Sequence, residues 1–190
     1  MADDNGGFVG GVKDGIVAAI RGTGEITDAL VDTVSGSLVN AVKKTGSVGG
    51  ALTGAVSEVV RGVIEGAVEI GGDLGSASKD AMLGVLRGTK EVGGESIDLV
   101  GDTAGAVVKS TSELGGDVGS AAKGAVEGAI VGAKDIGVSA EDAAAAAANG
   151  ALNAAGSIGS TAAGQVRDAL TGTIGGVKDV LKEPFKGDDK

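Results

Sequence analysis

One 22-residue pattern recurs along this sequence, and it limits the possible folds more than any other feature. It is clearest in VIEGAVEIGGD from residue 63, VLRGTKEVGGE from residue 85 and VVKSTSELGGD from residue 107. The same register holds, without an insertion, in AIRGTGEI from 19, AVKKTGSV from 41, AIVGAKDI from 129, ALNAAGSI from 151 and TIGGVKDV from 173. The repeat covers nearly the whole chain, and it describes an architecture rather than a reaction.

A half-period of 11 residues lies inside the repeat and predicts α-helix. FVGGVKDG from residue 8 resembles AIVGAKDI but stands 11 residues before the unit at 19, and units of eleven run from Phe8 to Glu183. This period is about 3.67 residues per turn, so each position keeps its direction around a helix. One group of positions fills an arc of roughly 160°, with the rest opposite. Strand alternation fits far worse.

Apolar side chains recur on this arc, and acids such as Glu69, Glu91 and Glu113 recur opposite them. We therefore predict an all-α fold of Gly/Ala-rich amphipathic repeats with one continuous, shallow apolar face. The predicted interaction face consists of Ile20, Ile26, Val42, Val48, Ile64, Ile70, Leu86, Val92, Val108, Leu114, Ile130, Ile136, Leu152, Ile158, Ile174 and Val180.

Glycines recur with the same period and leave two geometries open. If each Gly-Gly pair is a turn, the chain is a stack of antiparallel helices of about 20 residues, roughly 30 Å each. If the pairs are only small residues on a helix, one long helix or a few long pieces result, and the 11-residue half-period favours this continuity. The predicted turn or close-packing glycines are Gly49, Gly50, Gly71, Gly72, Gly93, Gly94, Gly115, Gly116, Gly124, Gly128 and Gly132.

Domain organisation follows from where the pattern starts and stops. Residues 1–7 are polar and Gly-rich, which predicts a flexible N-terminus. Residues 8–183 form a single repeat domain, Pro184 ends the pattern, and 184–190 form a polar C-terminal tail. The apolar residues are mostly Ala and Val, and 38 glycines accompany them. Such helices are weakly stable unless they pack against something.

Composition excludes several classes of protein. The net charge of −10 argues against nucleic-acid binding, and the absence of Cys excludes disulfides and thiolate metal sites. The first residues lack the basic start of a signal peptide. No run approaches the ~20 apolar residues of a transmembrane span. These features predict a cytoplasmic protein, or one on a cytoplasmic membrane or granule surface, although export without a signal peptide stays open.

No motif points to catalysis. A phosphate loop needs Lys-Ser or Lys-Thr behind its glycines, and the only Lys-Thr pair, Lys44-Thr45, has no glycine directly before it. The carboxylates lie beside Lys or Arg on the polar arc, which is typical of solvated charges. Without His, no Ser has the usual activating base. The calcium-loop spacing is missing too. We therefore expect no enzyme, no cofactor and no metal site.

Two groups of proteins share this texture. GAVEGAIVGAKDIG and SKDAMLGVLRGTKEVGG resemble the 11-residue repeats of perilipins, and AVKKTGSVGGALTGAVSEVV is similar to the repeat region of synucleins. Phasins and late-embryogenesis-abundant proteins have related textures. The resemblance implies a weakly hydrophobic helix that folds on lipid-droplet or vesicle surfaces. Gly is denser here, and the lysine excess that suits synucleins to acidic lipid is absent.

Two functional hypotheses follow, and glycine density favours the first. The first is a structural protein that self-associates through its Gly/Ala-rich helical face into a bundle, sheet or filament, as a homo-oligomer or polymer. The second is an amphipathic coat that binds a lipid droplet, a polyester granule or a neutral membrane. A stress-protective role is a weaker alternative, because the composition is too apolar.

Overall fold

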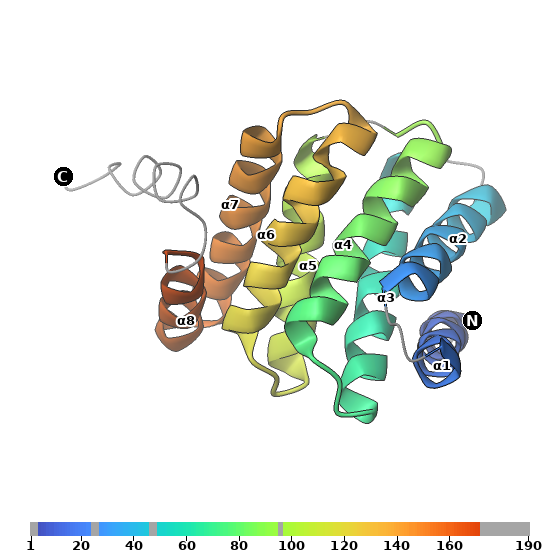
Figure 1. Ribbon diagram of the computed structural model, residues 1–190, viewed down its shortest axis with the longest axis horizontal. Helices are drawn as coiled ribbons and strands as arrows, with labels where there is room; N and C mark the ends of the chain where they lie inside the picture. The colour runs from blue at the N-terminus through green and yellow to red at the C-terminus, as the bar shows by residue number, and fades with distance from the viewer. Residues whose placement is uncertain (1–3, 24–26, 46–48, 95–96, 172–190) are drawn as a thin grey trace.

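A computed structural model describes residues 4–23, 27–45, 49–94 and 97–171, and these ranges contain helices and turns but no strand (Figure 1). The all-α prediction is confirmed. The predicted C-terminal tail, 184–190, lies outside the described residues. The helices are α1 (Asp4–Thr23), α2 (Thr27–Thr45), α3 (Gly49–Glu69), α4 (Leu74–Glu91), α5 (Ile97–Glu113), α6 (Val118–Gly132), the 3-10 helix η1 (Ala133–Ile136), α7 (Ala140–Ile158) and α8 (Ser160–Thr171).

The helices form two layers. The even-numbered helices pack side by side in one layer, and the odd-numbered helices pack in the other (Figure 1). The most extensive contacts therefore join helices that are two apart in the chain, such as α4 with α6 and α5 with α7. The result is a stack of short helices, in which each repeat contributes one helix and one turn.

Glycine turns separate the central helices. Gly71, Gly93 and Gly115 have φ values of 66°, 75° and 71°, a left-handed conformation that strains residues with a Cβ. The next glycine of each pair donates its N–H back to a carbonyl in the last turn of the helix, with N–O distances of 2.8 to 2.9 Å for Gly72 to Ala67, Gly94 to Thr89 and Gly116 to Thr111. The continuous helix that the half-period favours therefore does not form.

Side-chain caps start two of the helices that follow these turns. The carboxylate of Asp73 accepts from the Ser76 N–H at 2.7 Å, and that of Asp117 accepts from the N–H groups of Gly119 and Ser120. These hydrogen bonds lower the pKa of both carboxyls, with the contacts to Ser76 and Ser120 contributing most. An acid after the glycine pair thus begins the next helix as soon as the previous one ends.

The N-terminal part of the chain differs from the central repeats. Gly49 and Gly50, predicted as turn or close-packing glycines, are the first residues of α3. Ala51 follows them where Asp73 and Asp117 follow the later pairs, so no side chain caps a helix that starts after the pair. Within the segment 1–7, for which the sequence predicts a flexible N-terminus, α1 begins at Asp4, and residues 1–3 lie outside the described residues.

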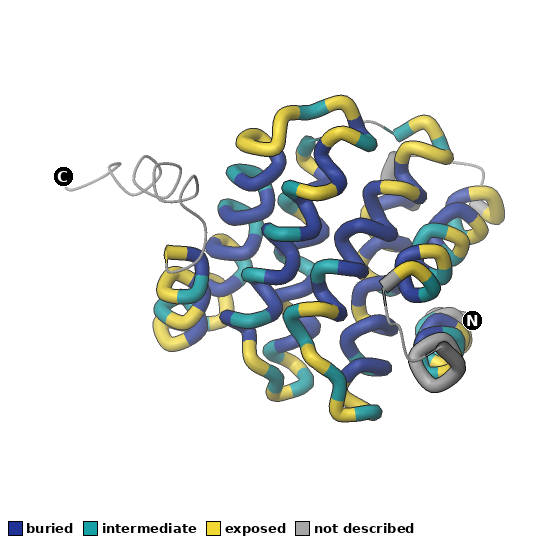
Figure 2. The backbone as a smooth tube through the Cα atoms, viewed as in Figure 1, coloured by how far each residue is buried: buried dark blue, intermediate teal, exposed yellow. Residues whose placement is uncertain are grey.

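The predicted interaction face lies largely inside the molecule, and Figure 2 shows buried backbone along the surfaces that the helices turn to one another. Ile158 is the exception, with 40% of its surface exposed. For Ile20 only the backbone is described, and Ile26, Val48, Ile174 and Val180 lie outside the described residues. Six face residues are buried and four more are partly buried: Val42, Ile64, Leu86, Val108, Ile136 and Leu152, then Ile70, Val92, Leu114 and Ile130.

Glycines allow neighbouring helices in a layer to approach until their backbones touch. A Cβ on Gly124 would collide with the carbonyl of Gly75, and one on Gly128 would lie 2.5 Å from the Lys79 carbonyl oxygen. Gly132 receives the Leu86 side chain in the same way. These three glycines are four residues apart on α6, so they form one strip that faces α4.

Candidate interaction surface

The described residues hold no group of three or more His, Cys, Asp or Glu side chains that could bind a metal ion. Nor does any helix among them have the length and apolar character needed to cross a bilayer. The search for a site therefore turns to the surface hollows and to buried polar groups.

A hollow with a volume of about 780 Å³ lies on the outer surface of α3, α5 and α7. This layer is behind α4 and α6 in Figure 1. We call this hollow the odd-layer trough. Its lining residues are Thr53, Val56 and Ser57 of α3, Ile97, Asp98, Gly101, Asp102, Gly105, Ala106 and Lys109 of α5, and Ala146, Asn149, Gly150, Asn153, Ala154 and Ser157 of α7.

The trough exists because its floor has almost no side chains. Gly101 faces the carbonyl of Ala146, and Gly105 faces the carbonyl of Gly150, so α5 and α7 meet there by backbone contact. Between Asp102 and Lys109 on α5, the lining residues are only Gly105 and Ala106. Close backbone packing below thus leaves an open depression above.

Hydrogen-bonding side chains line both walls at intervals of one helical turn. Asn149, Asn153 and Ser157 follow one another at i, i+4 spacing on α7, and Thr53 and Ser57 do so on α3. The hydroxyl groups of Ser57 and Ser157 donate to carbonyls of their own helices, those of Thr53 and Asn153, at 3.1 and 3.0 Å. Their oxygens can therefore act as acceptors toward a ligand.

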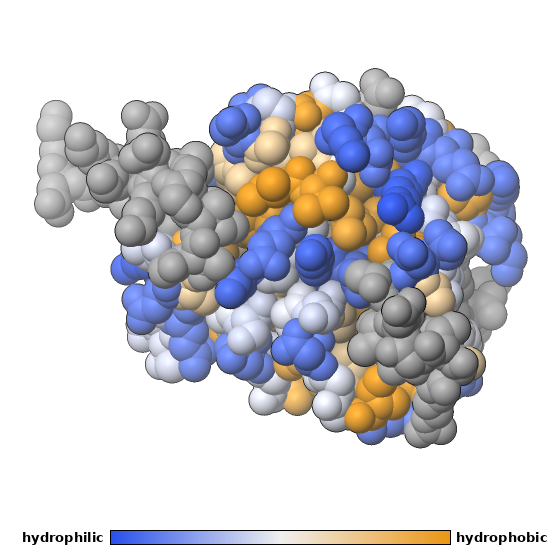
Figure 3. Space-filling view, in the orientation of Figure 1, coloured by the Kyte–Doolittle hydropathy of each residue, from blue (hydrophilic) through white to orange (hydrophobic). Residues whose placement is uncertain are grey.

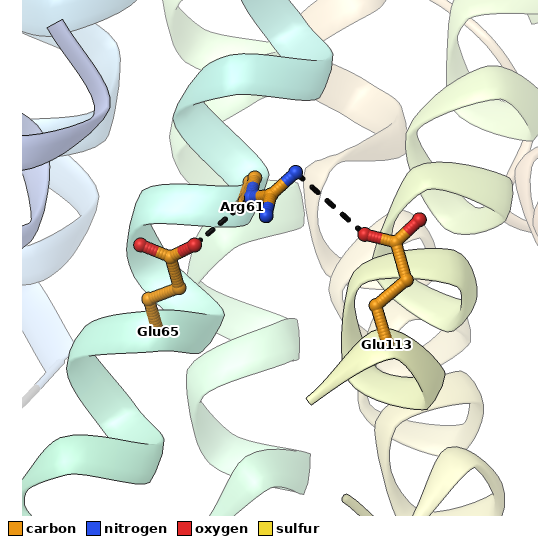
Figure 4. Close-up of polar contacts among 3 residues, drawn as sticks. All are labelled: Arg61, Glu65 and Glu113. Atoms are coloured by element: carbon orange, nitrogen blue, oxygen red, sulfur yellow. Dashed lines mark hydrogen bonds and ion pairs between the residues drawn. The ribbon is translucent and has the colours of Figure 1, made fainter. Parts of the chain in front are cut away.

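A smaller hollow of about 250 Å³ continues the trough between α3 and α5, and it shares Ser57, Ala106 and Lys109 with it. Figure 4 shows two of its lining residues, Arg61 and Glu113, together with the neighbouring Glu65. The Arg61 Nε donates to Glu65 Oε1 at 2.9 Å, and its Nη1 lies 3.7 Å from Glu113 Oε2. The hydrogen bond to Glu65 raises the pKa of Arg61 most, and the charges of Glu65 and Glu113 add to it. Arg61 thus links α3 to α5 beside the trough.

The opposite face of the molecule carries a separate apolar area. Figure 3 shows it over α6 and α4, with hydrophilic residues around it. Val131 of α6 is 50% exposed, and Val68 on α3 is 41% exposed elsewhere on the surface.

Asp80 is a buried acid that the sequence analysis missed. Only 1% of its surface is exposed, and neither carboxylate oxygen has a hydrogen-bond partner in the described structure. Burial raises its pKa to about 6; the Lys79 charge opposes this shift and Asp28 adds slightly to it. The repeat could have indicated this burial. Asp80 stands 44 residues, or two repeats, before Gly124, which touches the neighbouring helix. An acid at a helix-contact position is buried, not solvated.

The trough contains none of the predicted interaction-face residues or glycines. The sequence analysis predicted an apolar face on one side of each helix, and its period gives no information on the outer surface. Asn149 and Asn153 are polar residues of the alanine-rich α7, and the sequence analysis predicted neither as a site. No protein-family model matches this chain, and no curated protein matches its sequence.

Proposed function

We propose that this protein is a non-enzymatic helical-repeat scaffold that assembles with copies of itself, and that a second copy packs against the outer side of α1. The main support for this proposal is the way in which alternate helices stack. Each layer continues by adding a helix two positions along the chain, and among the described elements α1 has one neighbour of this kind, α3. None of the described helices covers its other side.

The contact between α1 and α3 shows what such packing needs. Gly62 of α3 lies against Val12 and the carbonyl of Val9, and Gly66 lies against Ile16 and the carbonyl of Lys13. A salt bridge of 3.0 Å between Lys13 and Glu69 borders this contact. Small residues on α3 therefore receive the apolar ridge of α1.

The outer side of α1 repeats the surface that α3 uses. Each outer residue of α1 stands two repeats, or 44 residues, before a residue of α3 in the sequence: Gly7 before Ala51, Gly11 before Ala55, Asp14 before Glu58 and Ala18 before Gly62. Of these α3 residues, Gly62 lies against α1. On α1 these four residues are exposed, and a Cβ on Gly7 or Gly11 would meet nothing within 4 Å. We call them the α1 outer stripe. The α1 outer stripe thus resembles in sequence the part of α3 that contains Gly62, and none of the described helices covers it.

A second copy suits this stripe better than an unrelated helix, because the packing rules are already set inside the chain. If the α1 helices of two copies pack against each other, the assembly closes as a symmetric dimer. If α1 of one copy packs against a different edge of the next copy, the result is an open chain of copies. The acid in the stripe, Asp14, restrains non-specific association, as charged edge residues do in other repeat proteins.

Light scattering after size exclusion tests the proposal. The wild type is expected to change from monomer to larger species as its concentration rises through the micromolar range. Gly11→Arg should stay monomeric, since the long charged side chain blocks close approach. Gly54→Arg is the matched control, because Gly54 is also an exposed helical glycine with nothing within 4 Å of a Cβ. A wild type that stays monomeric, or equal effects of the two variants, would contradict the proposal.

A second candidate is binding to an apolar surface, and the exposed area around Val131 favours it. The predicted face is buried in the core, so its use on lipid would require the helices to separate. Contact through Val131 needs no such opening. With neutral triglyceride emulsion, Val131→Glu should reduce flotation of the protein, while Val68→Glu should not. No flotation of the wild type rejects this candidate.

A further inference from the structure

We infer that the odd-layer trough binds a short, extended peptide segment that carries a basic residue at one end and an acidic residue at the other. This binding goes beyond self-assembly and uses a different surface, since the α1 outer stripe does not line the trough. The inference depends on three features of the trough: its length, its hydrogen-bonding walls and its charges.

The length fits a segment of about five residues. Asp102 and Lys109, the two charges that the segment would pair with, are seven positions apart on α5, or roughly 10 Å at 1.5 Å per residue. An extended chain covers this distance in about three residues, so a segment with three central residues and one charged residue at each end fits the two charges. A volume of about 780 Å³ is also within the range of ligand-binding clefts in general.

The walls match the period of an extended backbone. Side chains at i and i+4 on a helix are about 6 Å apart along the axis, and alternate residues of an extended chain are about 6.6 Å apart. Asn149 and Asn153 could therefore each reach a successive outward-facing peptide unit. A side-chain amide both donates and accepts, so it can pair with the N–H and C=O of one residue. Ser57 offers an acceptor on the opposite wall.

The floor suits the side chains of such a segment. Where Gly105 and Ala106 line the trough, no side chain larger than a methyl group rises from α5. Residues of the peptide that point inward would lie over Val56 and Ala154, which favours β-branched or other medium-sized apolar side chains. If α5 carried larger side chains at these positions, they would fill the trough themselves.

The charges give the segment its polarity. Asp102 and Lys109 are exposed on either side of the small floor residues, and neither forms an ion pair within the described part of the chain. Asp102 complements a lysine or arginine, and Lys109 complements an acid. The net charge of −10 further steers basic groups toward the protein. A free zwitterionic amino acid is too short to reach both charges, and it serves as the competing ligand in the test.

The test uses the full chain and a pentapeptide array with lysine first, glutamate last and the three central positions randomised. Binding of the best peptide is measured by fluorescence anisotropy at a concentration where light scattering shows monomers, and again in Gly11→Arg. Asp102→Lys should weaken binding at least tenfold, and replacing the peptide's lysine with glutamate should restore it. Asn153→Ala should weaken binding about fivefold for every charge arrangement. Glu141→Lys, an exposed site outside the trough, is the control.

The outcomes separate this inference from self-assembly. Binding that persists in monomeric Gly11→Arg and responds to Asp102→Lys with charge-swap rescue supports the trough whether or not the protein assembles. The inference is overturned if the protein binds the array no better than a control array whose peptides have glutamine at both ends. The inference is also overturned if Asp102→Lys and Asn153→Ala leave the peptide affinity unchanged. The same holds if free lysine or glutamate, measured by calorimetry, binds as tightly as the peptide.

Discussion

At the scale of single residues, glycine serves two unlike purposes in this chain. Gly71, Gly93 and Gly115 adopt a left-handed backbone that ends helices, whereas Gly124 and Gly150 remain helical and let two backbones touch. Sequence analysis could name both purposes but could assign neither to a given glycine. The choice depends on which surface of a helix meets a neighbour, and that is a tertiary property.

The first prediction compares two alanine substitutions. Gly124→Ala places a methyl group against the carbonyl of Gly75, so we expect a loss of about 1–3 kcal/mol in the free energy of unfolding. Gly36→Ala, on an exposed helical site with nothing within 4 Å of the new Cβ, should gain about 0.5–1 kcal/mol, because alanine favours helix. Urea unfolding followed by circular dichroism measures both. Equal shifts in the two midpoints would show that the close contact carries no strain.

The second prediction concerns Asp80. Burial raises the pKa of its carboxyl to about 6 in the folded chain, against 3.8 as the ordinary value. The folded state therefore keeps a proton that the unfolded state has lost, and the contribution of Asp80 to stability falls as pH rises from about 4 to about 6. Relative to Asp80→Asn, the wild type should lose about 2 kcal/mol over this window.

Urea unfolding of both proteins at intervals from pH 4 to pH 7 provides the measurement. Asp73 and Asp117 have lowered pKa values, so their contribution is present above the ordinary pKa and is lost as pH falls below it. Both proteins share this effect, and it cancels in the difference. Parallel stability curves for the two proteins would mean that water or a charge reaches the Asp80 carboxylate.

At the scale of helices and turns, the sequence predicts much of the structure from local chemistry. The 22-residue period, the helical face and the possible turns at Gly71, Gly93 and Gly115 could all be read directly. The choice between a continuous helix and a stack of helices could not be made from the sequence, because an 11-residue period is compatible with both. Local capping differs between the repeats: Asp117 begins α6 directly after Gly116, while Ala51 follows Gly49 and Gly50 within α3.

The third prediction tests this capping. Asp117→Ala removes the acceptor for the N–H groups of Gly119 and Ser120, which should lower the free energy of unfolding by about 1 kcal/mol at pH 7. The effect should shrink below the ordinary pKa of aspartate, where the wild-type carboxylate becomes protonated. Asp117→Asn retains a good capping side chain and should change stability by only a few tenths of a kcal/mol. Similar losses in both variants would assign the effect to charge instead of capping.

At the scale of the whole molecule, a stack of repeats has an interior and two ends. α4, α5 and α6 each contact helices on both sides within their layer or across it, whereas α1 contacts only α2 and α3 among the described elements. In such a stack, stability is approximately a sum of unit and nearest-neighbour terms, so the units at the ends open most easily. The odd-layer trough is centred on α5, in the part that should open least.

The fourth prediction follows from this gradient. In hydrogen exchange monitored by mass spectrometry at low protein concentration, amides of α4 to α6 should exchange at least tenfold more slowly than those of α1. If copies pack on the α1 outer stripe, raising the concentration should slow exchange in α1 selectively, because the association stabilises only the state in which α1 is folded. Gly11→Arg should abolish this concentration dependence and leave the interior unchanged. Uniform protection along the chain would instead indicate a single cooperative core, in which the open edge at α1 is no weaker than the rest.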